Sequence, residues 1–250
     1  MALIKDIGLV IRRLDYSETS QVLAVLCRET GQQRLIAKGS KRGTKSRASV
    51  GIDLLELGRL VYSRRPESDA QLSTLTDWQQ VDVFPRIRRD LSAWYAAQYA
   101  ADRTAQATQE ADPHPDLFDA LVELLASGEP ALAGLTRYLV SLLGEIGLMP
   151  QLRACAGCGA PRTPATFLYF SARHGGVLCR DCEPAFVEKR RVEPAAIDAV
   201  QIFFDDLPAP PADWLLPAFD LIDYHLSGVL AKPSRIAALL RANLSRAARS

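Results

Sequence analysis

Four cysteines in one short window constrain the fold of this chain more than any other feature. They form two Cys-x-x-Cys pairs, which are separated by twenty residues. Each pair sets two thiolates on a tight turn, and two such turns complete a tetrahedral four-thiolate shell for zinc. A filled shell leaves no position for a reactive water. We therefore predict one structural Zn²⁺ per chain, bound by Cys155, Cys158, Cys179 and Cys182.

The residues between the two pairs support a zinc-ribbon-like layout. Phe167–Phe170 has the composition of a strand, Gly175–Gly176 that of a turn, and Val177–Leu178 that of a second strand. Disulfides are disfavoured in a reducing compartment, and a redox role is disfavoured by two copies at metal-ligand spacing. His174 is predicted to be a turn residue, and the fifth cysteine, Cys27, a small buried hydrophobe.

A basic segment at residues 31–50 is the second constraining feature. The chain has a net charge of +1, yet residues 1–80 carry +4, residues 81–230 carry −8 and residues 231–250 carry +5. Residues 31–50 contain six basic side chains and no acid, interleaved with Gly, Ser and Thr. Residues 39–46 resemble a P-loop, but the glycines are four residues apart and no helix follows, which argues against nucleotide hydrolysis.

Two interpretations of the basic segment stay open, a solvated loop and a contact surface for phosphates. Each cation that neutralises a nucleic-acid phosphate releases a counterion, so such a segment can sustain strong, salt-dependent binding. The candidate nucleic-acid contacts are Arg34, Lys38, Lys41, Arg42, Lys45 and Arg47. Further basic side chains that could extend this surface are Arg12, Arg13, Arg86, Arg88 and Arg89.

The first third of the chain has the pattern of a small β-barrel. Apolar runs of strand length, separated by turn residues, are Leu3–Leu14, Gln21–Cys27, Arg34–Ala37, Leu54–Tyr62 and Gln71–Val81. Five short strands fit an OB-fold, although an SH3-like barrel has the same number. We predict an α+β protein in which a five-stranded barrel over residues 1–82 binds nucleic acid.

The remainder, residues 83–250, has helical periodicity and is predicted to be a mostly α-helical domain with the zinc insert at 151–184. One helix is predicted to begin after Pro85, and further helices are predicted to cover residues 115–126, 130–146, 194–204, 214–230 and 234–244. Aromatic side chains at helical spacing are interpreted as core residues in preference to base-stacking residues; they are Trp94, Tyr95, Tyr99, Trp214 and Tyr224. No apolar stretch reaches the roughly 18–20 residues of a membrane span, and no secretory signal is recognisable, so a cytoplasmic protein is expected.

Hydrolytic signatures are missing from the chain, which has three histidines. Acid pairs at Asp205–Asp206 and at Asp220 and Asp223 keep a metal-dependent nuclease open as an alternative. Another alternative is a zinc-stabilised regulator that binds a protein partner and has no direct role on DNA.

The order of these parts resembles the RecO family of bacterial recombination mediators. The resemblance spans residues 1 to about 230 and depends on Tyr16–Ser20 between two strands, on Ala37–Arg42 before the basic loop, and on the cysteine insert that follows Gly147–Pro150. The resemblance implies an OB-fold, a helical domain and no ATPase or other enzymatic activity.

The same resemblance implies partners and a cellular role. Such proteins bind single- and double-stranded DNA, anneal complementary strands, and help to load RecA onto DNA coated by the single-stranded-DNA-binding protein SSB. RecR and the carboxy-terminal tail of SSB are implied as direct partners, with RecF and RecA as indirect ones. Localisation would be cytoplasmic and nucleoid-associated.

Overall fold

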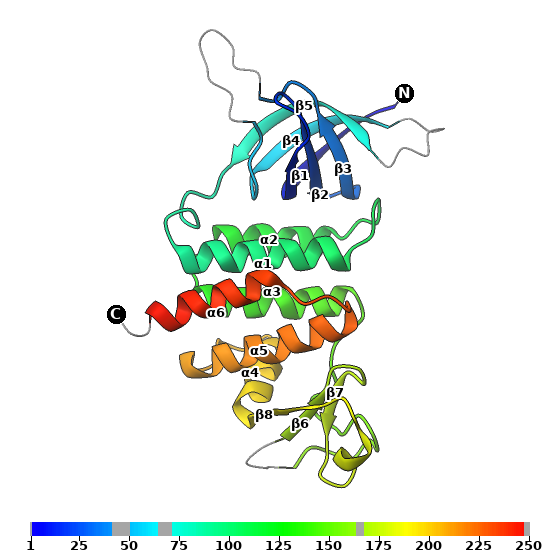
Figure 1. Cartoon of the computed structure of the whole chain (residues 1–250), viewed down its shortest axis with the longest axis vertical. Coiled ribbons are helices and arrows are strands. Elements are labelled where there is room, and N and C mark those ends of the chain that lie inside the picture. Colours follow the sequence, from blue (N-terminus) through cyan, green and yellow to red (C-terminus); the bar gives the residue numbers. More distant parts are fainter. Residues whose placement is uncertain (1, 42–50, 65–71, 164–167, 248–250) are drawn as a thin grey trace. The chain divides into compact units, whose positions relative to one another are not determined.

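The structure of the chain is a computed structural model that describes residues 2–41, 51–64, 72–163 and 168–247 (Figure 1). The chain divides into two compact units, Met1–Ala126 and Ser127–Ser250. Within the described residues, no helix combines the length and the apolar character needed to span a bilayer.

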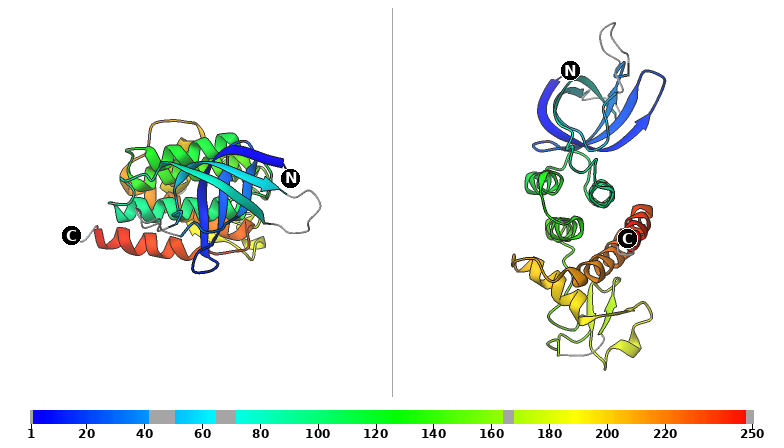
Figure 2. Two further views of the ribbon diagram at one scale, coloured as in Figure 1. Left: turned by 90° about the horizontal axis from the view of Figure 1, so that it is seen from above. Right: turned by 90° about the vertical axis from the view of Figure 1, so that its left-hand side faces the viewer.

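A closed barrel of five strands forms the amino-terminal part of the first unit (Figure 2). The strands are β1 (Ala2–Asp15), β2 (Gln21–Cys27), β3 (Gly31–Ala37), β4 (Leu57–Arg64) and β5 (Ser73–Asp82). Their order around the barrel is β1-β2-β3-β5-β4, and β3 and β5 pair in parallel while the other neighbours are antiparallel. This is the predicted five-stranded OB-fold barrel, and the SH3-like alternative is set aside.

Alternating side chains fill the barrel, as the period of two along a strand requires. In β2, Leu23 and Val25 are fully buried, whereas Val22 and Ala24 are only partly buried. Cys27 is fully buried in the same core, which confirms its prediction as a small hydrophobe. Burying a side chain such as Leu or Val contributes roughly 1.5–3 kcal/mol each, so this alternation fixes which face of β2 points inward.

Two helices complete the first unit, α1 (Leu91–Ala107) and α2 (Pro115–Ala126). Asp90 caps α1, because its Oδ1 accepts hydrogen bonds from the N–H groups of Ser92 at 2.8 Å and Ala93 at 3.2 Å. The right-hand view of Figure 2 looks along these helices, and α1 contacts β1 while α2 contacts β2.

Ion pairs fasten both helices to the barrel. Arg12 Nη2 lies 3.0 Å from Asp102 Oδ1 on α1. Arg28 makes a two-pronged contact with Asp119 on α2, at 2.9 and 2.7 Å. Hydrogen bonds from Arg28 hold the pKa of the Asp119 carboxyl below its usual range. The barrel ends at Asp82, yet α1 and α2 share its compact unit; a domain boundary at residue 82 stays a prediction.

The described residues of the second unit combine four α-helices with a small sheet. Its elements are α3 (Ala131–Glu145), β6 (Leu168–Ser171), β7 (Gly176–Leu178), the 3₁₀ turn η1 (Glu183–Ala185), β8 (Arg190–Val192), α4 (Pro194–Phe204), α5 (Ala212–Val229) and α6 (Arg235–Ala247). The sheet has the order β7-β6-β8, and the cysteines lie in turn segments outside its strands. Helices α4 and α5 pack together, and each contacts α3. The predicted helical domain with a zinc-ribbon-like insert is confirmed, and β8 is a strand that the sequence pattern did not predict.

The cysteine-bearing segment is joined to α5 through the carboxylate of Glu188. This carboxylate accepts hydrogen bonds from the Tyr224 hydroxyl, from Ser171 Oγ at 2.7 Å and from the Arg173 N–H at 3.0 Å. Burial raises the pKa of Glu188, but these donors outweigh burial and leave the pKa below its ordinary value.

An arginine of the last helix, α6, pairs with two carboxylates of α5. Arg241 Nε lies 2.6 Å from Asp220 Oδ1, and its Nη2 lies 2.6 Å from Asp223 Oδ2. Its guanidinium also lies 5.3 Å from the centre of the Phe219 ring. Because Asp223 is buried, this pairing neutralises a carboxylate that would otherwise be costly to bury.

Candidate metal centre and nucleic-acid interface

The four cysteines meet at one point in the second unit. Their Sγ atoms all lie within 4.8 Å of one another, with Cys155 buried and Cys158 exposed. In the parts of the chain that the structure describes, they form the one group of three or more His, Cys, Asp or Glu side chains arranged to hold a metal ion. The structure therefore brings together all four predicted ligands.

Backbone geometry prepares these thiols for a cation. The N–H groups of Gly157 and Cys179 each donate to Cys155 Sγ at 3.3 Å. Burial raises the pKa of Cys155, but the N–H donors around it prevail and bring that pKa to about 6. Hydrogen bonds with the neighbouring thiols of Cys179 and Cys158 raise the pKa of Cys182 to about 12. Four thiolates this close can all ionise only beside a positive charge, so the donor set fits a metal ion.

His174 lies outside this cluster, as predicted for a turn residue. Its Nδ1 is 3.0 Å from Ser171 Oγ, and its ring packs edge-on against Phe186 with centroids 4.5 Å apart.

Three of the six candidate DNA contacts fall in the described part of the basic segment. Arg34 is an exposed residue of β3, and its Nε lies 3.5 Å from Glu110 Oε1. Lys38 is exposed just beyond the end of β3, and Lys41 is partly buried with its Nζ 2.6 Å from Asp15 Oδ2. The other three, Arg42, Lys45 and Arg47, lie outside the described residues.

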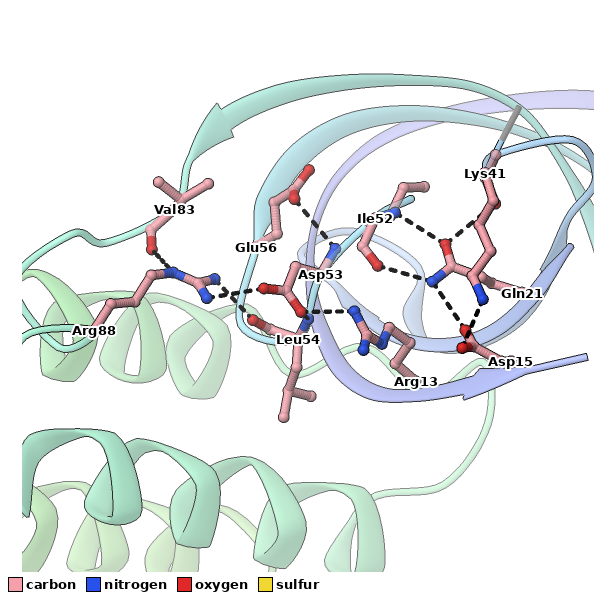
Figure 3. A network of polar contacts seen from close by, with 11 residues as sticks. Arg13, Asp15, Gln21, Lys41, Ile52, Asp53, Leu54, Glu56, Val83 and Arg88 are labelled. Carbon is pink, nitrogen blue, oxygen red and sulfur yellow. Dashed lines mark hydrogen bonds and ion pairs between the residues drawn. The ribbon is translucent and has the colours of Figure 1, made fainter. Parts of the chain in front are cut away.

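Gln21 bonds both to Ser40, within the basic segment, and to Ile52, just after that segment (Figure 3). Its fully buried side chain accepts from the Ile52 N–H at 2.9 Å and from Ser40 Oγ at 3.1 Å, and donates to Ile52 O at 3.3 Å. Its Nε2 also donates to Asp15 Oδ1 at 3.4 Å. Gly51 makes this approach possible, since at φ +84° a Cβ there would lie 2.5 Å from Gln21 Oε1.

Lys41 joins the same network from the other side. Its N–H donates to Thr19 O at 3.3 Å, and its ammonium group holds the pKa of the Asp15 carboxyl below its usual range. The turn between β1 and β2, the end of β3 and the segment before β4 are thus tied into one rim of the barrel.

Asp53 is a second anchor on this rim (Figure 3). Arg13 Nη1 lies 2.8 Å from its Oδ1, and Arg88 Nη1 lies 2.9 Å from its Oδ2. Arg88 also donates to Val83 O at 2.7 Å and to Leu54 O at 3.0 Å. All five arginines named as possible extensions of the DNA surface are exposed. Ion pairs hold Arg12, Arg13 and Arg88 to carboxylates of the first unit, and a role for any of the five in DNA contact stays a prediction.

Sequence reasoning missed Gln21 and Asp53 as organisers of this rim. Gln21 opens an apolar strand, and Asp53 stands between apolar residues. A polar residue beside an apolar run is a weak signal for a buried partner, and nothing in the sequence identifies that partner.

The acid pairs that kept a nuclease open are tied to arginines. Both carboxylate oxygens of Asp205 accept from Arg153 Nη2, at 2.6 and 2.8 Å, and Asp206 lies 3.7 Å from Arg137. Asp220 and Asp223 share Arg241, as described above. A carboxylate that is neutralised by an arginine is a poor candidate for binding a catalytic cation.

Comparison with known proteins identifies similar sequences along the chain. The family profile "Recombination protein O N terminal" matches residues 1–84, and "Recombination protein O C terminal" matches residues 88–235. A protein named DNA repair protein RecO from Anaeromyxobacter sp. (strain K) is 34% identical over 184 residues, which cover 72% of this chain and 71% of that protein. Another of the same name, from Bacillus pumilus, is 28% identical over 204 residues, covering 80% of this chain and 77% of that protein.

Proposed function

The chain belongs to the recombination protein O (RecO) family of DNA repair proteins, and from this premise we propose that it is a DNA-binding recombination mediator that catalyses no covalent step. It anneals complementary strands and, with RecR and RecF, helps RecA to load onto single-stranded DNA coated by SSB. The observation that carries the proposal is the run of cations in the sequence after β3, in which Lys38 is exposed and Lys41 is fixed to the rim of the barrel.

Annealing by such a surface needs only electrostatics. Two complementary strands repel each other through their phosphates, and a cationic surface that binds both lowers this repulsion without consuming nucleotide. The contacts proposed for DNA are Arg34, Lys38, Lys41, Arg42, Lys45 and Arg47. Lys41 is expected to contribute less than Lys38, because its charge is already compensated by Asp15.

Zinc is proposed as the metal of the four-cysteine centre, with one structural ion per chain. Four thiolates are the ligands that zinc takes in structural sites, and they leave no coordination position for water or substrate. The strands β6, β7 and β8 are only three or four residues long. The metal would therefore stabilise the turn segments beside them.

Partners and location follow from the family. We propose that RecR and the carboxy-terminal tail of SSB bind this protein directly, that RecF and RecA act through those complexes, and that the protein works in the cytoplasm at the nucleoid.

Fluorescence anisotropy with a labelled single-stranded oligonucleotide tests the proposal, followed by an annealing assay and a gel of the same samples with and without Mg²⁺. Salt-sensitive binding, faster annealing and intact strands are expected. The Lys38→Glu variant should weaken binding, whereas Arg173→Glu, an exposed arginine of the second unit, serves as the matched control. Wild-type protein that binds no DNA at low salt would favour the protein-interaction regulator, and cleaved strands would favour the nuclease.

A further inference from the structure

The outer face of the barrel carries an apolar row that crosses three strands. Leu14 on β1 pairs with Val22 on β2, and Val22 pairs with Ile36 on β3. Directly paired residues point to the same side of a sheet. Because Leu23 and Val25 fill the core, Val22 and its partners face outward. Leu14 is 66% exposed.

Tyr16 extends this face beyond the end of β1. The Tyr16 N–H donates to Ser20 O at 3.0 Å, which continues the β1–β2 ladder by one more pair. The period of two then places the Tyr16 ring on the side of Leu14, and the residue is 67% exposed. A large aromatic and a leucine left in solvent on neighbouring positions require an explanation, since exposed apolar patches commonly mark binding surfaces.

The turn that carries Tyr16 is held in place by hydrogen bonds. Ser17 Oγ accepts from the Ser20 N–H at 3.1 Å, the Ser17 N–H donates to Ser20 O at 3.1 Å, and Thr19 O accepts from the Lys41 N–H at 3.3 Å. The ring therefore stands on a fixed turn, so that little conformational freedom would be lost when a ligand packs against it.

Cations border the apolar row along the strands. Lys38, which follows β3 directly and stands two residues after Ile36, is exposed. On the other side of the row, Ala24 of β2 is the cross-strand neighbour of Arg12 on β1 and of Arg34 on β3. Both arginines therefore also face outward. Arg12 is paired with Asp102 and Arg34 with Glu110, which leaves Lys38 as the exposed lysine beside the strip. An apolar and aromatic strip with this cation beside it is complementary to a chain of flat bases joined by phosphates.

We propose that Tyr16 and Leu14 contact unpaired bases, with Tyr16 as a stacking platform, and that this contact makes the barrel prefer single-stranded to double-stranded DNA. The inference rests on the proposed function and deepens it. Every base has a face on which an aromatic ring can stack, whatever the sequence. In a duplex these faces are covered by neighbouring base pairs, so that only the phosphates remain for the cations.

Anisotropy titrations of Tyr16→Ala and Leu14→Ala, with labelled oligo(dT) and with a labelled duplex, test this. The Tyr16→Ala variant loses one stacked base, so it is expected to bind oligo(dT) roughly 5- to 140-fold more weakly than wild type. Duplex binding should stay within about two-fold of wild type, and Tyr16→Phe should retain oligo(dT) binding. Leu3→Ala is the matched control for Leu14→Ala, because Leu3 is an equally exposed leucine at the other end of β1, 67% against 66%.

Outcomes separate this inference from the function on which it rests. Equal oligo(dT) binding by wild type and Tyr16→Ala would overturn the base contact while leaving a DNA-binding mediator intact, and would assign the strip to a protein partner. Equal weakening for oligo(dT) and duplex would also overturn it, because a phosphate contact or a fold defect would then be the cause. Wild-type protein that binds neither oligo(dT) nor the duplex would overturn both the base contact and the proposed function. Photo-cross-linking to an oligonucleotide with 5-iododeoxyuridine should modify the peptide that contains Tyr16, and cross-links confined to other peptides would contradict the proposal.

Discussion

Replacing Gln21 by leucine is expected to destabilise the barrel strongly, although the volume changes little. Gln21 is fully buried and bonds both backbone groups of Ile52, the N–H at 2.9 Å and the carbonyl at 3.3 Å. A buried group that loses its partner costs about 1–3 kcal/mol. The longer carbonyl contact lies at the low end of this range, and the 3.4 Å contact with the exposed Asp15 adds little. The free energy of unfolding should therefore fall by about 2–4 kcal/mol.

Urea denaturation followed by circular dichroism measures this loss. The matched control is Gln79→Leu, which makes the same exchange at an exposed position of β5 and should change the unfolding free energy by no more than about 0.5 kcal/mol. Gln21 also positions Ser40, within the basic segment, and Ile52, just after it. DNA affinity, measured without urea on the folded variant, should therefore fall as well. A Gln21→Leu variant as stable as Gln79→Leu would refute the assignment of Gln21 as the buried tie of this rim.

Three further predictions concern the second unit. Cys155→Ser should lose the bound zinc, measured by elemental analysis, and lower the thermal midpoint, whereas wild-type protein purified without zinc yet equally stable would contradict a structural metal. The fold lowers the pKa of Glu188. Its contribution to stability is therefore present above the ordinary pKa of 4.5 and is lost as the pH falls through the lowered pKa of the folded state. Glu188→Gln should reduce this loss of stability in acid, measured by melting at a series of pH values, and a pH profile identical to that of wild type would contradict it. Arg241→Ala leaves the buried Asp223 without its partner and should lower the unfolding free energy. Breaking a fully buried ion pair costs about 3–5 kcal/mol, and the loss here should be smaller because Arg241 is partly exposed. Unchanged protection of α6 in hydrogen exchange would show that this arginine does not hold the helix.

Local signals in the sequence predicted a large part of the fold. The limits of β2, α2 and α4 agree with the predicted ranges residue for residue, because a turn or a proline marks each beginning and a strong apolar period continues to the end. The two Cys-x-x-Cys pairs predicted the thiol cluster for the same reason: ligands that are neighbours in the chain need only one long-range contact to meet.

Contacts between distant segments escaped the sequence analysis. In α1, Trp94, Tyr95 and Tyr99 are predicted as core residues, yet Trp94 and Tyr95 are only partly buried, while a series of alanines is buried with Tyr99. Alanine has little apolar area to mark a face, and its small size becomes informative only when another element packs closely. The pairings of Gln21 with Ile52 and of Asp53 with two arginines likewise depend on segments that the barrel brings together.

The salt dependence of single-strand binding tests the central claim most directly. Fluorescence anisotropy with oligo(dT) should be measured across a salt series for wild type and for the variant Arg42→Glu, Lys45→Glu, Arg47→Glu. Each lost phosphate contact lowers the slope of log affinity against log salt by about 0.7 for a single strand. The account predicts a slope shallower by about 2 in the triple variant, with weaker binding at every salt concentration. Equal slopes and equal affinities in the two proteins would contradict DNA binding through the basic segment.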